Sequence, residues 1–267
     1  MIATGSDEHS EGIARRVGQL IVDTAHNAPR STQVAIGPSE IGDVCERKLT
    51  YKLLDWPTVD QGDPIASVIG TGMHSWMEDA FRARQSKLPD GRDRYKIESR
   101  VTVRTGPTPA STITGSADLF DRLTGTNLDW KLTGVSSLDK YRRQGPHAAY
   151  HAQAHLYGMG QANAGEDVKR VAIVFIGRHH ELRVHVWSEP YREDVARAAL
   201  QRLDRITARA MSTDFEAEPH RWAEVPTDEK AACRFCPWLR SGSTDLATGC
   251  PGVGSTRPGA SLSALIA

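Results

Sequence analysis

The 267-residue sequence has no long apolar segment and no excess of charge of either sign. No uncharged apolar stretch reaches the roughly 18 residues that a membrane-spanning helix needs. Residues 1–12 also lack the hydrophobic run of a signal peptide, so we expect a cytoplasmic protein with no membrane partner. The 33 basic and 33 acidic side chains cancel. Only local basic clusters, such as the one over residues 82–104, can indicate a nucleic-acid partner, and charge alone favours a solvated charged face over that interpretation.

Cysteine is scarce, with four residues in the chain. Without an export signal these are unlikely to form structural disulfides, because the cytoplasm keeps thiols reduced, and metal binding is the main alternative. Cys233 and Cys236 form a pair with two residues between them, Cys250 follows, and Cys45 lies far upstream. Four cysteine ligands suit a zinc ion as well as an iron–sulfur cluster, so the count leaves both open.

Hydrophobic periodicity predicts helices first and strands afterwards. Apolar residues at helical spacing predict a helix over 11–25, and a linker over 27–37 follows. Ser39 is placed as the N-cap of a helix that ends near Trp56 and carries Cys45 on its inward face. A further helix is expected over 72–84.

The period then changes to two, which is typical of half-buried strands. Strands are expected over 96–103, 113–122 and 127–133, as an antiparallel meander in which Glu98 is one of the alternating polar residues. A basic loop, a helix over 146–162, a hairpin of strands 171–177 and 182–187, and a helix over 190–211 complete the order. This order predicts an α/β fold with a mixed sheet.

Two carboxylates and a lysine are expected to meet on neighbouring strands. Period two places Asp129 and Lys131 on one face of their strand, and Asp118 lies on the adjacent antiparallel strand. Carboxylate oxygens suit Mg²⁺ or Mn²⁺, and a lysine can orient the attacking water. The alternative for an Asp-x-Lys triplet is a surface ion pair.

Two pairs of polar residues at helical spacing flank these strands. His74 and Glu78 lie four residues apart, as do Gln153 and Tyr157, so each pair shares a helix face. Either pair alone is also explained by an ordinary position at the surface or at the edge of the core.

Four motifs in order resemble the RecB-family branch of the PD-(D/E)XK nucleases. They are Gly70-Thr71-x-x-His74, Gly115-x-x-Asp118, Asp129-x-Lys131 and Gln153-x-x-x-Tyr157. The resemblance covers residues 39–250. It implies a restriction-endonuclease-like core, in which a central mixed sheet is flanked by helices.

The resemblance also implies roles for individual residues. It makes His74, Asp118, Asp129 and the backbone carbonyl of Trp130 ligands of the catalytic metal, with Lys131 as the catalytic lysine. Glu78 would assist at the metal, and Gln153 and Tyr157 would contact DNA or hold the lysine and phosphate. Products would carry a 5′ phosphate and a 3′ hydroxyl.

The arrangement of one early and three late cysteines is similar to that of iron–sulfur members of the family, which include CRISPR-associated exonucleases. This implies a structural 4Fe–4S cluster on Cys45, Cys233, Cys236 and Cys250 that joins the N- and C-terminal segments. Zinc remains the alternative. The expected organisation is a flexible stretch over 1–12, one nuclease domain over 13–250 with its cysteine segment at 219–250, and a flexible tail over 251–267.

These motifs predict a DNA exonuclease acting on single-stranded or free ends in recombination, replication or repair, in a bacterium or a phage-infected cell. Tyr141, Arg142 and Arg143 are candidate nucleic-acid contacts together with Gln153 and Tyr157. No Gly-x-x-x-x-Gly-Lys-Ser/Thr motif is present, so a helicase or recombination protein would be a separate partner. A non-catalytic DNA-binding module, a nuclease that trims DNA for CRISPR adaptation, and an oligomer remain open.

Overall fold

The computed structural model describes residues 4–28, 35–60, 62–108 and 111–253. The chain divides into two compact units, and each is built from segments that are distant in the sequence. Unit 1 comprises residues 1–42 and 63–203, and unit 2 comprises residues 43–62 and 204–267. The predicted domain boundaries stay predictions, and most of the expected tail lies outside the described residues. No helix of the described part is long and apolar enough to cross a membrane.

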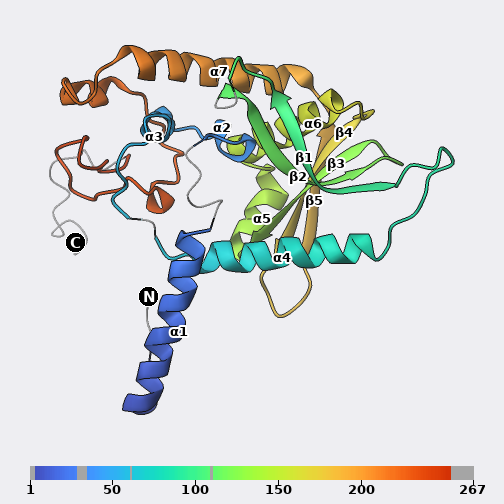
Figure 1. Ribbon diagram of the computed structural model, residues 1–267, viewed down its shortest axis with the longest axis horizontal. Coiled ribbons are helices and arrows are strands. Elements are labelled where there is room, and N and C mark those ends of the chain that lie inside the picture. The colour runs from blue at the N-terminus through green and yellow to red at the C-terminus, as the bar shows by residue number, and fades with distance from the viewer. Residues whose placement is uncertain (1–3, 29–34, 61, 109–110, 254–267) are drawn as a thin grey trace. The chain divides into compact units, whose positions relative to one another are not determined.

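Unit 1 is built on a five-stranded mixed sheet, which confirms the predicted fold class (Figure 1). In spatial order its strands are β1 (Tyr95–Arg104), β2 (Ile113–Asp121), β3 (Thr126–Thr133), β4 (Arg170–Gly177) and β5 (Val184–Pro190). Only the β3–β4 pair is parallel. Helices α5 (Val135–Gln144) and α6 (Ala148–Asn163) connect these two strands, because a parallel pair needs a crossover connection.

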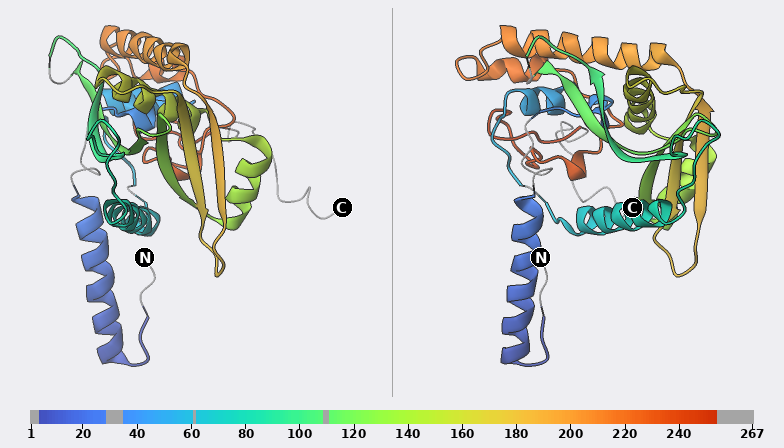
Figure 2. Two further views of the ribbon diagram at one scale, coloured as in Figure 1. Left: turned by 90° about the vertical axis from the view of Figure 1, so that its right-hand side faces the viewer. Right: turned by 45° about the vertical axis from the view of Figure 1, so that its right-hand side comes forward.

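Helices cover both faces of the sheet (Figure 2). On one face, Val174 and Ile176 of β4 share a hydrophobic cluster with Met73 and Met77 of α4 (Ile65–Arg82). On the other face, their neighbours along β4 pack against α6. Burial on both faces explains why β4 is a continuous apolar run rather than an alternating one.

The predicted helix from Ser39 to Trp56 is wrong, because two short helices replace it. These are α2 (Pro38–Ile41), whose N-cap is Gly37, and α3 (Glu46–Leu53), whose N-cap is Cys45. Cys45 is buried as expected but precedes its helix. The chain turns at Gly42, where an added Cβ would lie 2.7 Å from Ala149 Cα on α6. Close packing on α6 therefore requires glycine at the break.

The predicted basic loop after β3 is also wrong, since residues 135–144 form α5. Leu138 is the buried residue of this helix. A single buried apolar residue gives no helical periodicity in the sequence, so the helix could not be predicted. The remaining predicted helices are present with shifted ends. They are α1 (Glu8–His26), α4, α6 with His147 rather than Pro146 at its start, and α7 (Glu193–Ser212).

Unit 2 is held together by aromatic side chains instead of a sheet. Tyr51 of α3 lies 4.1 Å from Trp222 and 5.6 Å from Trp238, measured between ring centroids. The Tyr51 hydroxyl donates to Leu246 O, and the Trp56 indole donates to Ala247 O. The short segment around α3 is thereby packed into the C-terminal segment of the chain.

Candidate active site

A separation of two strands makes room for the candidate site. The β2–β3 ladder ends at the pair Leu119 and Leu128. Beyond this point the backbone N–H of Trp130 donates to Asp118 Oδ2, at 2.7 Å, instead of to β2. A buried side chain thus replaces the strand partner, and both Asp118 and Asp129 lie where the strands diverge.

Three side chains that could hold a metal ion meet at one side of this opening. His74 from α4, Glu98 from β1 and Asp118 from β2 each offer one atom, and these atoms all lie within 4.8 Å of one another. His74 Nδ1 is 3.3 Å from Asp118 Oδ1, and this interaction raises the pKa of His74. The structure therefore brings together the two residues predicted from sequence with a third that was not predicted.

Glu98 was missed because its position in the alternating pattern is that of a solvent-facing strand residue. Its φ angle is +43°, in the left-handed region that non-glycine residues seldom adopt and that costs energy. The regular β1–β2 pairing passes from Ile97 directly to Ser99. No local feature of the sequence identifies this strained residue.

Asp129 and Gln153 are buried on the face of the sheet toward α6, and the partly buried Lys131 joins them. Gln153 Nε2 donates to Asp129 Oδ1 at 2.8 Å, and Lys131 Nζ lies 2.6 Å from Asp129 Oδ2. Asp129 Oδ2 is nevertheless buried without a hydrogen bond of acceptable geometry. Burial raises the pKa of the Asp129 carboxyl, and Lys131 opposes that rise.

One face of α6 contributes to the site. Tyr150, Gln153 and Tyr157 lie at positions i, i+3 and i+7 of this helix, so they share a stripe. Lys131 Nζ lies 4.8 Å from the ring centroid of Tyr150, close enough for a cation–π interaction. Tyr157 packs over Gly115, where an added Cβ would lie 2.9 Å from its ring. Gly115 of the Gly-x-x-Asp motif therefore leaves room for Tyr157 of the Gln-x-x-x-Tyr motif.

Glu78 shares the α4 face with His74 but forms an ion pair with Arg82. Glu98, and not Glu78, belongs to the group with His74 and Asp118. The predicted role of Glu78 at the metal stays a prediction, as does that of the Trp130 carbonyl.

Most of the basic cluster over residues 82–104 is neutralised by ion pairs. Lys87 pairs with Asp93, Arg94 with Asp121, and Lys96 with Glu166. This pairing favours the solvated-face interpretation for that segment.

The basic end of α5 is different. Arg142 lies 3.7 Å from Asp139, whereas Lys140 and Arg143 are exposed and form no ion pair with any residue that the structure describes. Tyr141 stacks on Phe175 at 4.3 Å, and burial raises its pKa to about 12. Of the three predicted contacts on α5, the arginines face solvent and the tyrosine is part of the packing.

The oxygen donors fit a hard divalent cation. Asp118, Asp129 and Glu98 supply carboxylates, and His74 adds a nitrogen ligand of the kind that Mn²⁺ also accepts. Asp129 Oδ2 is buried and has the Lys131 ammonium at 2.6 Å, without a hydrogen bond of acceptable geometry, so the carboxylate keeps lone pairs that a metal ion could bind. The residues present therefore fit a catalytic metal.

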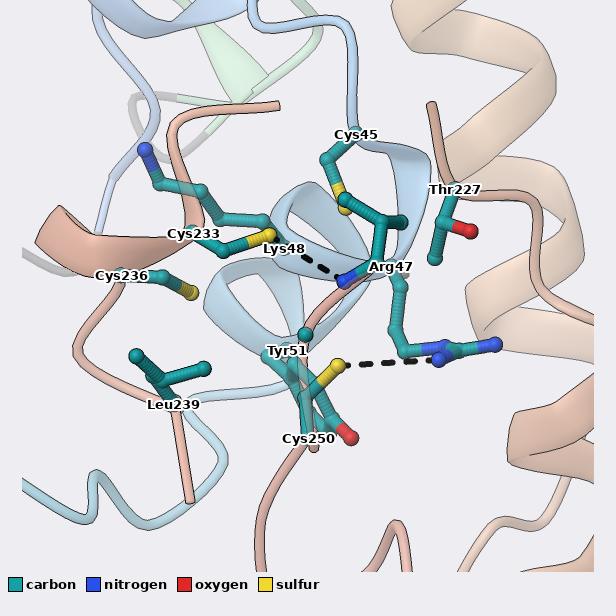
Figure 3. A pocket seen from close by; sticks show the side chains of 11 residues that line it. Cys45, Arg47, Lys48, Tyr51, Thr227, Cys233, Cys236, Leu239 and Cys250 are labelled. Atoms are coloured by element: carbon teal, nitrogen blue, oxygen red, sulfur yellow. Dashed lines mark hydrogen bonds between the residues drawn. The ribbon is translucent and has the colours of Figure 1, made fainter. Parts of the chain in front are cut away.

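The four cysteines line a single pocket in unit 2, together with Arg47, Lys48 and Tyr51. Figure 3 shows the four thiols turned toward this pocket. No three of their sulfur atoms lie within 4.8 Å of one another, although all four residues are described. Burial raises the pKa of Cys45, and raises that of Cys236 to about 11, so these thiols are neutral near pH 7 when no metal is bound.

Unit 1 thus carries two carboxylates and a lysine where two strands of its mixed sheet separate, with α6 packed nearby. The chain belongs to the PD-(D/E)XK nuclease superfamily, whose family model matches residues 56–241. This segment contains all the residues of the candidate active site.

Two solved exonucleases are similar in structure. An alkaline exonuclease (LHK-Exo) from Laribacter hongkongensis is 10% identical, with 72% of this chain and 95% of that chain covered and a TM-score of 0.45. A phage-related exonuclease from Haemophilus somnus is 10% identical, with 66% and 93% covered and a TM-score of 0.46. A comparison with curated protein sequences finds no match.

Proposed function

We propose that this protein is a Mg²⁺- or Mn²⁺-dependent deoxyribonuclease that degrades DNA from its ends. The observation that carries the proposal is the buried Asp129 carboxylate, which has Lys131 on one oxygen, Gln153 on the other, and no hydrogen-bond donor of good geometry for Oδ2. A buried carboxylate is favourable only with cationic partners. Lys131 supplies one such partner, and a metal ion bound to the neighbouring carboxylates would supply a second.

The protein's own groups have distinct tasks in this proposal. Asp118, Asp129, Glu98 and His74 would hold the metal, which would activate water and neutralise charge on the phosphate. Lys131 would orient the water or stabilise the developing charge. Gln153 fixes the orientation of Asp129, and Trp130 N–H fixes that of Asp118.

DNA is the proposed substrate because exposed basic residues follow the site directly. Helix α5 begins four residues after Lys131 and carries Lys140, Arg142 and Arg143 near its end. Such cations bind phosphates without reading sequence. This suits an enzyme that cuts along a strand, and we propose a role in recombination or repair with a separate helicase.

The test is the degradation of end-labelled single- and double-stranded DNA with Mg²⁺, Mn²⁺ or EDTA. Asp129→Ala and Lys131→Ala should each abolish metal-dependent cleavage. Asp167 and Lys169 provide a matched control, because they are also an Asp-x-Lys pair, 3.5 Å apart, but exposed. Asp167→Ala and Lys169→Ala should leave cleavage unchanged. Intact DNA with folded wild-type protein under every condition would contradict the proposal.

We further propose that the cysteine pocket holds a 4Fe–4S cluster. Tetrahedral zinc with Zn–S bonds of about 2.3 Å requires sulfur atoms about 3.8 Å apart. The four sulfurs share a pocket but are more widely spread than this, since no three lie within 4.8 Å. Wider spacing suits a cluster in which each thiolate binds a different iron atom.

Anaerobic purification followed by iron, sulfide and zinc analysis tests this assignment. About four iron and four sulfide per chain, lost in Cys233→Ser, would support the cluster. One zinc per chain, or no metal in folded protein, would contradict it.

A further inference from the structure

Arg47 occupies an unusual position beside the four cysteines. It is the second residue of α3, two positions after Cys45, and lines the same pocket. Its Nη1 donates toward Cys250 Sγ at 3.6 Å (Figure 3). Its Nη2 donates to Val225 O at 3.2 Å. Its backbone N–H donates to Pro226 O at 3.1 Å. The guanidinium is thus anchored against the pocket from two sides.

No carboxylate among the described residues compensates the charge of this guanidinium. Arg47 forms no ion pair with any carboxylate in the part of the chain that the structure describes, and its Nε is buried without a hydrogen-bond partner. Lys48, the other cation that lines the pocket, is paired with Asp43 at 2.6 Å. A partly buried cation with an unsatisfied N–H is unfavourable unless an anion completes the site.

Four thiolates bound to a metal would supply that anion. Four thiolates carry a formal charge of about −4, and either Zn²⁺ or a cluster core of charge +2 leaves about −2 in the pocket. A buried dianion has the complementary need for a cation and N–H donors. The negative charge of the metal-bound thiolates would therefore be balanced in part by Arg47, and the positive charge of Arg47 by the thiolates.

We infer that Arg47 is a positioning residue that donates to Cys250 and compensates the charge of a tetrathiolate metal centre. The inference rests on the proposed centre, but not on whether iron–sulfur or zinc occupies it. Removal of Arg47 leaves all four ligands in place while it removes the hydrogen bond to sulfur and one positive charge. The centre is then expected to release metal faster. If the centre is iron–sulfur, its more negative reduced form also becomes less favourable.

The experiment compares wild type, Arg47→Gln, Arg47→Lys and the control Arg234→Gln, all full-length and purified without oxygen. Arg234 lies between Cys233 and Cys236 in sequence, but it stacks on Phe235 and does not line the pocket. Two quantities are measured for each protein: the rate of metal loss to a chelator and, for an iron–sulfur centre, the midpoint potential followed by visible absorbance. Circular dichroism establishes that each variant is folded.

Arg47→Gln should lose metal at least about tenfold faster than wild type. Its one-electron potential should fall by up to about 59 mV, the equivalent of a tenfold change. Arg47→Lys, which keeps the charge, should restore most of the potential, and Arg234→Gln should match wild type.

If wild type contains the metal and Arg47→Gln has the same rate of metal loss and the same potential, the role of Arg47 is overturned while the proposed centre stands. Wild type that contains neither iron nor zinc would overturn the proposed centre, and the Arg47 inference with it. If the centre contains zinc, the rate of metal loss is the one measurement that tests the role of Arg47.

Discussion

Replacing Glu98 by glycine should increase stability and abolish activity at the same time. The φ angle of +43° at Glu98 costs a non-glycine residue about 1–2 kcal/mol, and glycine does not bear this cost. Glycine loses about 0.5–1 kcal/mol more backbone entropy on folding. The net change in the free energy of unfolding is therefore a gain of up to about 1.5 kcal/mol.

Activity should change in the opposite direction because Glu98 is one of three side chains whose ligand atoms lie within 4.8 Å. Loss of this carboxylate should reduce metal-dependent DNA cleavage at least about 100-fold, equivalent to about 2.7 kcal/mol in the barrier. Glu98→Gln should lose similar activity without the backbone gain in stability. In Glu78→Gln the rate of DNA cleavage should fall less than about tenfold, because Glu78 forms an ion pair with Arg82.

Urea unfolding of the metal-free proteins measures the first effect, and initial rates on end-labelled DNA measure the second. A Glu98→Gly variant as active as wild type, together with an inactive Glu78→Gln variant, would refute the reasoning. It would also favour Glu78 over Glu98 for the role at the metal.

Three further predictions follow from single contacts. Tyr150→Leu removes the ring 4.8 Å from Lys131 Nζ and should lower kcat about tenfold with little change in KM. Tyr150→Phe keeps an aromatic ring and should retain most of the activity. Equal loss of activity in both variants would count against the cation–π role. Gly115→Ala places a Cβ 2.9 Å from the Tyr157 ring and should cost about 1–3 kcal/mol in thermal unfolding, so an unchanged melting temperature would contradict the packing. Burial lowers the pKa of His155 below its ordinary value of 6.5, so His155 of the unfolded chain gains a proton first as pH falls. The free energy of unfolding should therefore decrease below pH 6.5 by up to about 1.4 kcal/mol per pH unit. Urea unfolding at pH 7.5 and 5.5 should show a smaller decrease for His155→Gln than for wild type.

Much of unit 1 follows from local patterns in the sequence. Alternation of apolar and polar residues places β1, β2 and β3 within one or two residues of their observed ends. The two-residue period also puts Asp129 and Lys131 on one face of β3, where Lys131 contacts Asp129. Side-chain direction in a strand depends on the backbone alone, so a pattern in sequence is sufficient to predict it.

Tertiary contacts decided the features that the sequence did not reveal. Helix α5 has too few apolar residues to show a period, and the break between α2 and α3 depends on how closely Gly42 approaches α6. Cys45 could be expected to be buried but not to be an N-cap.

The assembly of the candidate site shows the same division. Asp118, Asp129, Lys131 and the spacing of residues on α4 and α6 are visible in the sequence by themselves. Glu98 has the same local pattern as the solvent-facing residues of β1, and only its strained backbone and the separation of β2 from β3 direct it to His74 and Asp118. Chain periodicity determines which face a side chain occupies, whereas convergence on one point depends on distances between elements that are far apart in the chain.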